Sequence, residues 1–367
     1  MLFHLLLISL VSLITGVDSI GQPPQAELLF VGDAMQHQAQ LDKAKELGNG
    51  SNYDYSDCFT LIAPEILKAD YAVCNLEVPL GGGSDYTGYP CFSAPDSYAI
   101  ALQDAGFDMM LTANNHCLDR RDKAARRTIA VLDSLGIDHI GTYTDVAARD
   151  SLVPFIKDIN GFKIGFLNYT YGTNGIEPID GIEVSLIDKD KISQEIRKTR
   201  EAGAELIVVA MHWGVEYVLL ENKAQRNLAN FLIDEGVDMV IGGHPHVIQP
   251  MQIVRNDKEN KDVLVVYSLG NFISNMKTAD TRGGAMVRAI VTRDETGKAK
   301  FHSADYDIFF AAKPHGLTNF KVIPSWMPES IPCAQYDHWK LFERGALKIF
   351  DKYNINVSQR HRSNNTL

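Results

Sequence analysis

The sequence lacks several signatures that would assign it to a class directly. Its 367 residues contain five cysteines but no C-x-x-C pair, which excludes the usual zinc-ribbon and thioredoxin spacings. Neither G-x-S-x-G nor H-E-x-x-H occurs, so an α/β-hydrolase serine nucleophile and a zincin protease are not indicated. No lysine follows the glycine run at 81–83, which is therefore more typical of a loop than of a P-loop.

Positive charge and long apolar runs are also scarce. Lys plus Arg number 35 against 46 Asp plus Glu, a net charge of −11, so nucleic acid is not an expected partner. The same charge would repel a small phosphorylated substrate unless bound cations reversed the local field. Beyond the N-terminus no stretch approaches the ~20 apolar residues of a membrane span. A content of 45% hydrophobic and 22% charged residues is typical of a folded globular protein, and the length leaves one large or two smaller domains open.

The N-terminal segment 1–21 is predicted to be a signal peptide. Residues 1–17 read MLFHLLLISLVSLITGV, an apolar run that is short for a span, and Val17 and Ser19 supply a small-residue cleavage pattern. The positive n-region is missing, so an uncleaved membrane anchor remains the alternative. We expect an exported protein in the periplasm or at the cell surface, which contacts a membrane only through this segment if it is uncleaved.

Four segments repeat one local pattern, in which an amphipathic helix ends at a glycine and a short apolar strand follows. The glycines fit the left-handed position that terminates a helix, and the helical period gives way to a continuous apolar run after each of them. The four glycines are Gly106, Gly136, Gly203 and Gly236, and the strands that follow are predicted at 107–111, 137–140, 206–211 and 237–241.

This pattern predicts an α/β fold. Continuous apolar strands between helices favour a sheet of substantial parallel character with helices on its faces, and strands at 28–31 and 71–74 join it. A hairpin is expected around Asn160-Gly161. From 249 to about 308 short β-type runs predict a second, more antiparallel sheet packed on the first. Residues 311–367 are expected to form a helical C-terminal extension with a frayed polar end from Ser358.

Residues able to bind a metal follow five of the six apolar strands. Ligands of open α/β sheets lie beyond the carboxyl ends of the strands, and imidazole with carboxylate suits manganese, iron or zinc better than calcium. One carboxylate able to bridge would allow two ions ~3.5–4 Å apart. The turn from Tyr169 to Gly175, which contains Asn174, is either a substrate contact or an ordinary turn. The leading candidates are Asp33, Glu77, Asn115, His116, His212, His244 and His246, followed by Asn75, Asp119, Glu216 and His37.

Six motifs in series resemble the CapA family of poly-γ-glutamate capsule biosynthesis proteins, a branch of the calcineurin-like metallophosphoesterases. The resemblance covers about residues 27–310 and implies a four-layer α/β/β/α sandwich of two packed mixed sheets flanked by helices. The motifs are FVGDAM with Asp33, CNLEVPL with Glu77, LTANNHCLD with Asn115 and His116, MHWGVEY with His212, GGHPHVIQP with His244 and His246, and YSLGNF at 267–272.

The resemblance also implies a role for each residue. Asp33 and His246 would bind the first of two ions, Glu77 would bridge both, and the second ion would be completed by Asn115, His212 and His244. His116 would be the general acid or transition-state stabiliser, with a structural hydrogen-bond donor as its alternative. Glu216, Asn75 and Asn174 would lie outside the ligand set, as supporting or substrate-contacting residues. Met35 stands where the superfamily usually has a histidine ligand, so the first site is either weak or completed by a residue such as His37.

The predicted function is that of an exported metal-dependent phosphoesterase associated with capsule or exopolymer synthesis at the cell envelope. It would use one or two divalent Mn, Fe or Zn ions on an anionic small molecule or polymer, and other capsule-synthesis proteins are possible partners. Two alternatives stay open: a non-catalytic component of a polymer synthesis or export assembly, and amide chemistry on poly-γ-glutamate. The residue at position 35 favours the first alternative, whereas the Asn115-His116 pair favours catalysis.

Overall fold

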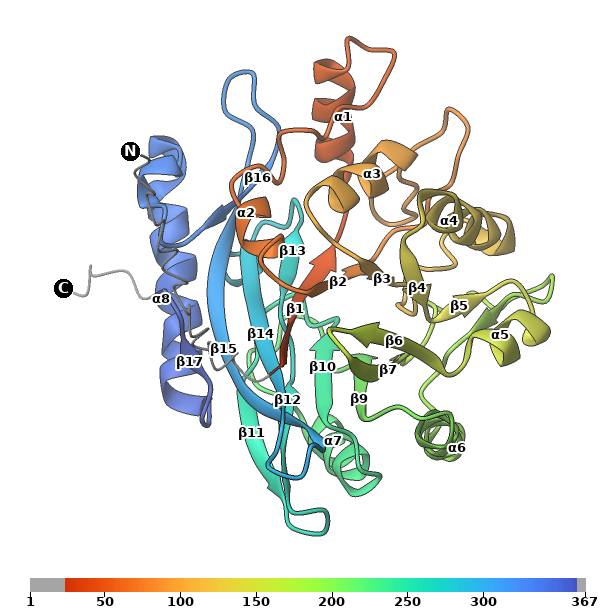
Figure 1. Cartoon of the computed structure of the whole chain (residues 1–367). Helices are drawn as coiled ribbons and strands as arrows, with labels where there is room; N and C mark the ends of the chain where they lie inside the picture. The colour runs from red at the N-terminus through yellow and green to blue at the C-terminus, as the bar shows by residue number, and fades with distance from the viewer. Residues whose placement is uncertain (1–23, 362–367) are drawn as a thin grey trace, which may run out of the picture.

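A computed structural model describes residues 24–361, in which two mixed β-sheets pack face to face and helices cover their outer sides (Figure 1). The predicted fold of two packed mixed sheets flanked by helices is thereby confirmed. The predicted signal peptide or anchor at residues 1–21 lies outside the described residues, as does the end of the tail from residue 362.

The first sheet combines a parallel half with an antiparallel half. β1, β2, β3 and β4 are parallel neighbours, and β14, β15 and β16 extend the sheet antiparallel from the other side of β1. In sheet order the strands are β16 (Lys321–Pro324), β15 (Ala299–Ala312), β14 (Gly283–Arg293), β1 (Gln25–Ala34), β2 (Tyr71–Leu76), β3 (Met109–Leu111) and β4 (Asp138–Ile140), with β13 (Asn271–Ile273) beside β1 and β17 (Ser358–Gln359) beside β15.

The second sheet has a parallel centre and two antiparallel edges. β12, β10, β9 and β7 run parallel, and the hairpin partners β11 and β6 close the two sides. The predicted hairpin turn is present, with Asn160 and Gly161 both at positive φ. The strands are β11 (Met251–Asn256), β12 (Lys261–Val266), β10 (Met239–Gly243), β9 (Leu206–His212), β7 (Phe162–Thr170) and β6 (Phe155–Ile159), and a separate ribbon pairs β5 (Thr142–Tyr143) with β8 (Glu183–Val184).

The assignment of strands to sheets predicted from the sequence is wrong. We expected 249–308 to form a sheet of its own, yet β11 and β12 join the second sheet while β14 and β15 join the first. The six apolar strands likewise divide between the two sheets. An apolar run indicates that a strand is buried, but pairing depends on backbone hydrogen bonds that leave no trace in composition.

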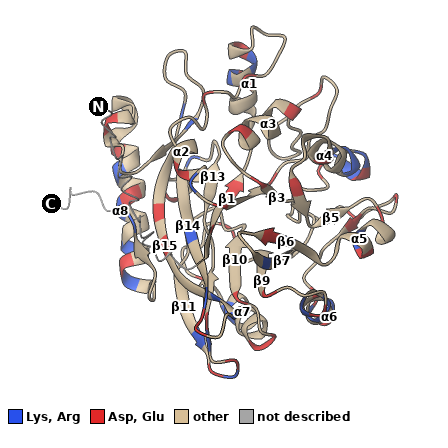
Figure 2. Cartoon of the chain, in the orientation of Figure 1, with Lys and Arg blue, Asp and Glu red and all other residues tan. Residues whose placement is uncertain are grey.

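Successive side chains of a strand point to opposite faces of its sheet, and the apolar ones form three layers. On β1, Leu28 and Phe30 face the space between the sheets, whereas Leu29 and Val31 face outward toward helices. On β9, Leu206 and Val208 face inward in the same way. Charged residues concentrate on the outer helices and loops, and the central strands carry few of them (Figure 2).

The helices occupy the outer faces and end where the sequence predicts. α1 to α4 pack with the outward face of the first sheet, and α6 and α7 with that of the second. All four predicted helix-ending glycines have positive φ, between 69° and 106°. The helices are α1 (Gln38–Leu47), α2 (Ala63–Ile66), α3 (Asp96–Asp104), α4 (Arg121–Leu135), α5 (Val146–Leu152), α6 (Lys189–Glu201), α7 (Lys223–Asp234) and α8 (Tyr336–Tyr353).

The C-terminal helix α8 lies beside β15 and seals one side of the core (Figure 1). Its apolar face, with Trp339, Phe342 and Phe350 buried, belongs to the same cluster as the inward faces of the two sheets. Among residues 24–361, no helix combines the length and the apolar character that a membrane crossing requires.

Candidate metal centre

The predicted metal-binding residues meet where the carboxyl ends of parallel strands from both sheets converge. Asp33 lies near the end of β1, Glu77 follows β2, and Asn115 with His116 follows β3 in the first sheet. The second sheet supplies His212 at the end of β9, and His244 and His246 after β10. The candidate centre therefore joins two sheets, where the sequence alone suggested one edge of a single sheet.

Glycines allow the strands to approach closely enough for this convergence. A Cβ atom at Gly32 would lie 1.9 Å from the carbonyl oxygen of Gly270, and one at Gly243 would lie 2.8 Å from Oδ1 of Asp33. Contacts this short are not formed by real Cβ atoms, so the two positions require glycine. The glycines of the VGD and GGHPH motifs thus bring the two halves of the centre together.

Asp33 is a fully buried carboxylate held from both sheets. Asn75 Nδ2 donates to its Oδ1 at 2.8 Å, the His244 backbone N–H donates to its Oδ2 at 3.2 Å, and His246 Nδ1 lies 3.2 Å from Oδ2. Burial raises the pKa of Asp33, but the hydrogen bonds and charges of its neighbours, led by His246, outweigh that effect and hold the pKa well below its usual value. Asp33 is therefore ionised.

Glu77 is the least satisfied group of the centre. Its side chain is completely buried, and neither carboxylate oxygen has a hydrogen-bond partner among the described residues. Oε1 lies 3.5 Å from His212 Nε2 and 3.8 Å from His246 Nε2. Burial, followed by the charges of Asp33 and Glu216, raises the pKa of Glu77 well above its usual value. A buried carboxylate without donors is costly unless a cation neutralises it.

His212 and His244 present nitrogen atoms beside Glu77. His212 Nε2 lies 2.7 Å from Asn115 Oδ1, so the imidazole, the amide oxygen and the Glu77 carboxylate face one small space. His244 Nδ1 is buried without a partner among the described residues. Burial, together with neighbouring histidines, lowers the pKa of His212 well below its usual value and that of His244 to about 4. Both rings are therefore neutral, the form that binds metals.

His246 is oriented by Asn271, a residue without a predicted role. Asn271, at the start of β13, lies with Oδ1 3.0 Å from His246 Nδ1. A proton on Nδ1 serves this contact and leaves Nε2 free toward Glu77, the arrangement common to metal-binding histidines. The sequence does contain a signal for this role, because Asn271 belongs to the YSLGNF motif at 267–272.

His116 is paired with Asp119 beside the centre. His116 Nδ1 lies 2.8 Å from Asp119 Oδ2, and that oxygen also accepts the backbone N–H of Phe92 at 2.8 Å. Phe92 packs edge-on against the imidazole, with ring centroids 4.7 Å apart. Asp119 is a secondary candidate by sequence, and its contact with His116 gives it a definite position beside the centre.

Asn174 lies in the same neighbourhood although it is exposed. Its Oδ1 accepts a hydrogen bond from Asn115 Nδ2 at 3.2 Å, and its Nδ2 lies 3.5 Å from His116 Nδ1. The turn after β7 is thus connected to the centre. Tyr171 from this turn also lies over His244, with ring centroids 4.5 Å apart.

Three groups of side chains place their ligand atoms within 4.8 Å of one another. The orphaned oxygens of Glu77 and nitrogen of His244 fit a divalent cation, and mixed imidazole and carboxylate donors suit Mn, Fe or Zn. Met35 is buried in the apolar layer under the helices and supplies no ligand, and His37 is in none of the groups. The groups are Asp33, Glu77 and His246; Glu77, His212 and His244; and Glu216, His244 and His246.

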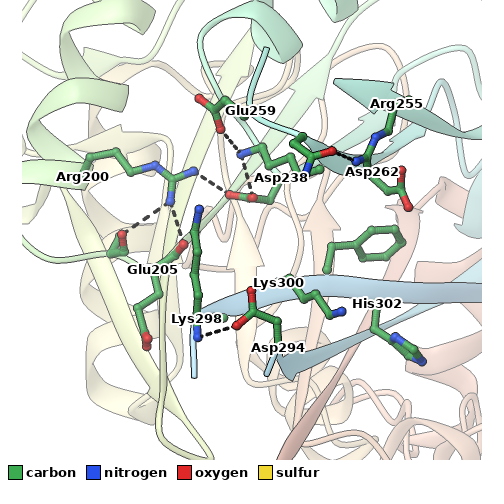
Figure 3. Close-up of a pocket in the computed structure, with 15 residues that line it drawn as sticks. Arg200, Glu205, Asp238, Arg255, Glu259, Asp262, Asp294, Lys298, Lys300 and His302 are labelled. Atoms are coloured by element: carbon green, nitrogen blue, oxygen red, sulfur yellow. Dashed lines mark hydrogen bonds and ion pairs between the residues drawn. The ribbon is translucent and has the colours of Figure 1, made fainter. Parts of the chain in front are cut away.

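A cavity of about 860 Å³ lies elsewhere, at the amino ends of β9, β10 and β12 (Figure 3). Its charged groups largely neutralise one another: Arg200 and Lys261 both bind Asp238, and Arg255 binds Asp262. The cavity is therefore a paired polar surface rather than a second concentration of metal-binding residues.

The fold and the centre define a class: an α/β protein of two packed mixed sheets with a candidate metal centre at their shared edge. A family model described as the bacterial capsule synthesis protein PGA_cap matches residues 27–276, more than half of the chain. The chain belongs to this family, and the membership predicted from the six motifs is confirmed.

Two relatives show the extent of the similarity. The capsule biosynthesis protein CapA of Bacillus anthracis is 27% identical over 271 residues, which are 71% of this chain and 62% of that protein. The PGA biosynthesis protein CapA of Bacillus subtilis (strain 168) is 26% identical over 283 residues, which are 73% of this chain and 68% of that protein. The chain thus spans less than two thirds of the B. anthracis protein.

Solved structures with a similar arrangement are more distant. The Haemophilus influenzae NAD nucleotidase NadN has a TM-score of 0.49 at 11% identity, covering 93% of this chain and 65% of that one. The calcineurin-like phosphoesterase YfkN of Bacillus subtilis has a TM-score of 0.44 at 12% identity, covering 89% and 99%. Similarity at this level has no bearing on activity.

Proposed function

We propose that this protein is an exported, metal-dependent hydrolase of the phosphoester type that takes part in the synthesis of a capsule or exopolymer. The observation that carries the proposal is Glu77, a buried carboxylate without a hydrogen-bond donor that faces His212 and His246 from the other sheet. Such a group is stable when a cation supplies the missing positive charge.

The described side chains divide into two sets of ligands. Asp33 and His246 would hold one ion. A second ion would be held by His212, His244 and Asn115, and Glu77 would contribute to both sets. When bound, divalent ions lower the pKa of a water molecule and stabilise the charge that develops on phosphoryl oxygens. They would also reverse the field of a protein of net charge −11 at the point where an anionic substrate binds.

His116 would act as the proton donor to the leaving group. Asp119 accepts from Nδ1, fixes the ring and leaves Nε2 as the nitrogen that can exchange a proton. Asn174, which contacts both Asn115 and His116, would orient the substrate beside them. A site that bound metal for structural reasons alone would not require the pair of His116 and Asp119.

The polymer context rests on relatives whose names refer to capsule, PGA and polyglutamine synthesis. An anionic polymer or its precursor is therefore the proposed substrate class, and other synthesis proteins are the proposed partners. A non-catalytic role in such an assembly is the second candidate, and the buried Met35 favours it because one site has one ligand fewer. Hydrolysis of poly-γ-glutamate amide bonds at the same centre is tested by the same variants.

The test compares wild-type protein lacking residues 1–21 with His244→Ala and His116→Ala. Metal content is measured by elemental analysis, and turnover is measured with a phosphomonoester, a phosphodiester and poly-γ-glutamate in added Mn²⁺. We expect His244→Ala to lose metal and His116→Ala to retain it while turnover falls ~10²–10⁴-fold. Metal binding without turnover on any substrate would support the non-catalytic candidate and contradict the hydrolase proposal.

A further inference from the structure

We propose that Glu216 is itself a ligand of the metal centre, the carboxylate that takes the place of the histidine absent at position 35. The inference rests on the proposed function, because it assumes that the centre holds metal. It differs from the supporting role that the sequence resemblance implied for this residue.

The position of Glu216 supports this assignment. One of its carboxylate oxygens and a ring nitrogen of each of His244 and His246 lie within 4.8 Å of one another. Glu216 also contributes to the raised pKa of Glu77, after burial and Asp33, so its charge lies close to the centre of the cluster. Its side chain is partly exposed, which places it on the side of the centre that solvent reaches.

The loop that carries Glu216 is fastened directly to the loop of the two histidines. The Trp213 N–H donates to the Gly243 carbonyl at 3.1 Å, and the Tyr217 N–H donates to the Pro245 carbonyl at 2.8 Å. Glu216 therefore lies between two backbone anchors. The buried Trp213 adds a third, because its Nε1 donates to the Tyr267 carbonyl at 2.9 Å.

The loop also holds an unfavourable backbone conformation next to Glu216. Tyr217 has a φ of +66°, in the left-handed region that is unfavourable for a non-glycine residue. Such conformations persist where the surroundings enforce them, and they concentrate at functional sites. The same residue donates its N–H to the Pro245 carbonyl, so the strained position is attached to the loop of the two histidines.

Neither Met35 nor His37 belongs to the three groups of converging ligand atoms. Met35 is 1% exposed and packs in the apolar layer under the helices. His37 accepts the Asn275 backbone N–H on Nδ1 at 3.3 Å and packs edge-on against Phe92, with ring centroids 5.4 Å apart. The possibility that His37 completes the first site is not supported by these contacts.

The charge of the centre is consistent with a third carboxylate. Two divalent cations carry more positive charge than Asp33 and Glu77 neutralise. Adding Glu216 leaves a centre that is still positive and can bind an anionic substrate. A carboxylate at the solvent side also completes a coordination shell without burying another uncompensated charge.

The test measures metal binding rather than turnover. Metal-free protein is titrated calorimetrically with Mn²⁺, and the metal retained after dialysis is counted by elemental analysis for wild type, Glu216→Gln, Asp33→Asn and Glu177→Gln. Glu177→Gln removes the same charge from an exposed loop position outside all three groups. Circular dichroism spectra establish that each variant is folded.

We expect Glu216→Gln to bind one Mn²⁺ at least tenfold more weakly than wild type, as Asp33→Asn does, and Glu177→Gln to match wild type. A different result would overturn the assignment of Glu216: wild type binds Mn²⁺, Asp33→Asn weakens that binding, and Glu216→Gln leaves the affinity and the number of bound ions unchanged. The proposed function would then stand. If wild type binds no Mn²⁺, Zn²⁺ or Fe²⁺, the proposed function and this inference fail together.

Discussion

At the scale of single residues, the candidate centre is an arrangement of groups that are costly without a cation. Glu77 has no donor among the described residues, and His244 has an unpartnered nitrogen although both are buried. Residues selected for stability alone would be expected to satisfy these atoms. The unfavourable burial of Glu77 therefore has a measurable consequence for the metal-free protein.

Glu77→Gln should stabilise the metal-free protein. The amide keeps the shape of the side chain and removes the cost of burying or protonating the carboxylate, so the free energy of unfolding in a chelator at pH 7 should rise by about 1–3 kcal/mol. Adding Mn²⁺ should then stabilise wild type and leave Glu77→Gln unchanged. Urea unfolding with and without metal measures both effects, with Glu177→Gln as the control. A metal-free Glu77→Gln protein that is less stable than wild type would show that Glu77 has a favourable partner.

The cysteines give a second prediction at this scale. Burial raises the pKa of Cys74, and the same cause raises the pKa of Cys117 to about 12, whereas Cys333 is exposed. Because the thiolate is the reactive form, iodoacetamide at pH 8 should label Cys333 in the native protein and leave Cys74 and Cys117 unlabelled until denaturant is added. Peptide mass spectrometry measures the extent at each site. Equal native labelling of Cys74 and Cys333 would contradict the buried position of β2.

At the scale of helices and strands, glycine has two separate uses. Gly136 ends α4 in the left-handed conformation, and a Cβ there would contact nothing within 4 Å. Gly32 has no such backbone requirement, yet a Cβ there would meet the carbonyl of Gly270 at 1.9 Å. The first position is restricted by conformation and the second by the close approach of β1 to the segment before β13.

The two glycines predict different losses of stability. Gly136→Ala should lower the free energy of unfolding by about 1–2 kcal/mol, the cost of the left-handed conformation for alanine. Gly32→Ala must displace backbone beside Asp33, so it should cost about 3 kcal/mol or more and also weaken Mn²⁺ binding. Thermal unfolding and Mn²⁺ titration of both variants separate the effects. If Gly136→Ala weakened metal binding as much as Gly32→Ala, the distinction would be wrong.

The elements also show how much the sequence predicts. Helix ends at Gly106, Gly136, Gly203 and Gly236 follow from local chemistry, and the strands after them follow from apolar runs, so both were predicted. The sequence did not predict that β14 and β15 belong to the first sheet, because sheet membership depends on pairing between segments that are distant in the chain. In the same way, the order of the motifs identified Asp33 and His246. Only the fold shows that Asn75 donates to Asp33 and that Asn271 contacts His246.

At the scale of the whole molecule, the candidate centre is a junction between the two sheets. Asp33, Glu77 and Asn115 come from the first sheet, while His212, His244 and His246 come from the second. The direct contacts across this junction include the hydrogen bond from the His244 N–H to Asp33. A metal ion bound by both sets would connect the sheets at the end where their parallel strands terminate, while α8 seals the core elsewhere.

Metal should therefore protect both sheets together. At a Mn²⁺ concentration of 100 times Kd, the bound state gains about 2.7 kcal/mol, which slows amide exchange about 100-fold wherever exchange requires the junction to open. Hydrogen–deuterium exchange should slow in peptides covering residues 75–78 and 112–116 of the first sheet and 212–217 and 242–248 of the second. Asp33→Asn should reduce the protection in both sets, because the ion that Asp33 would bind from the first sheet also takes His246 from the second. Protection confined to one sheet would mean that metal binds there without connecting the two, and the junction would then be maintained by core packing alone.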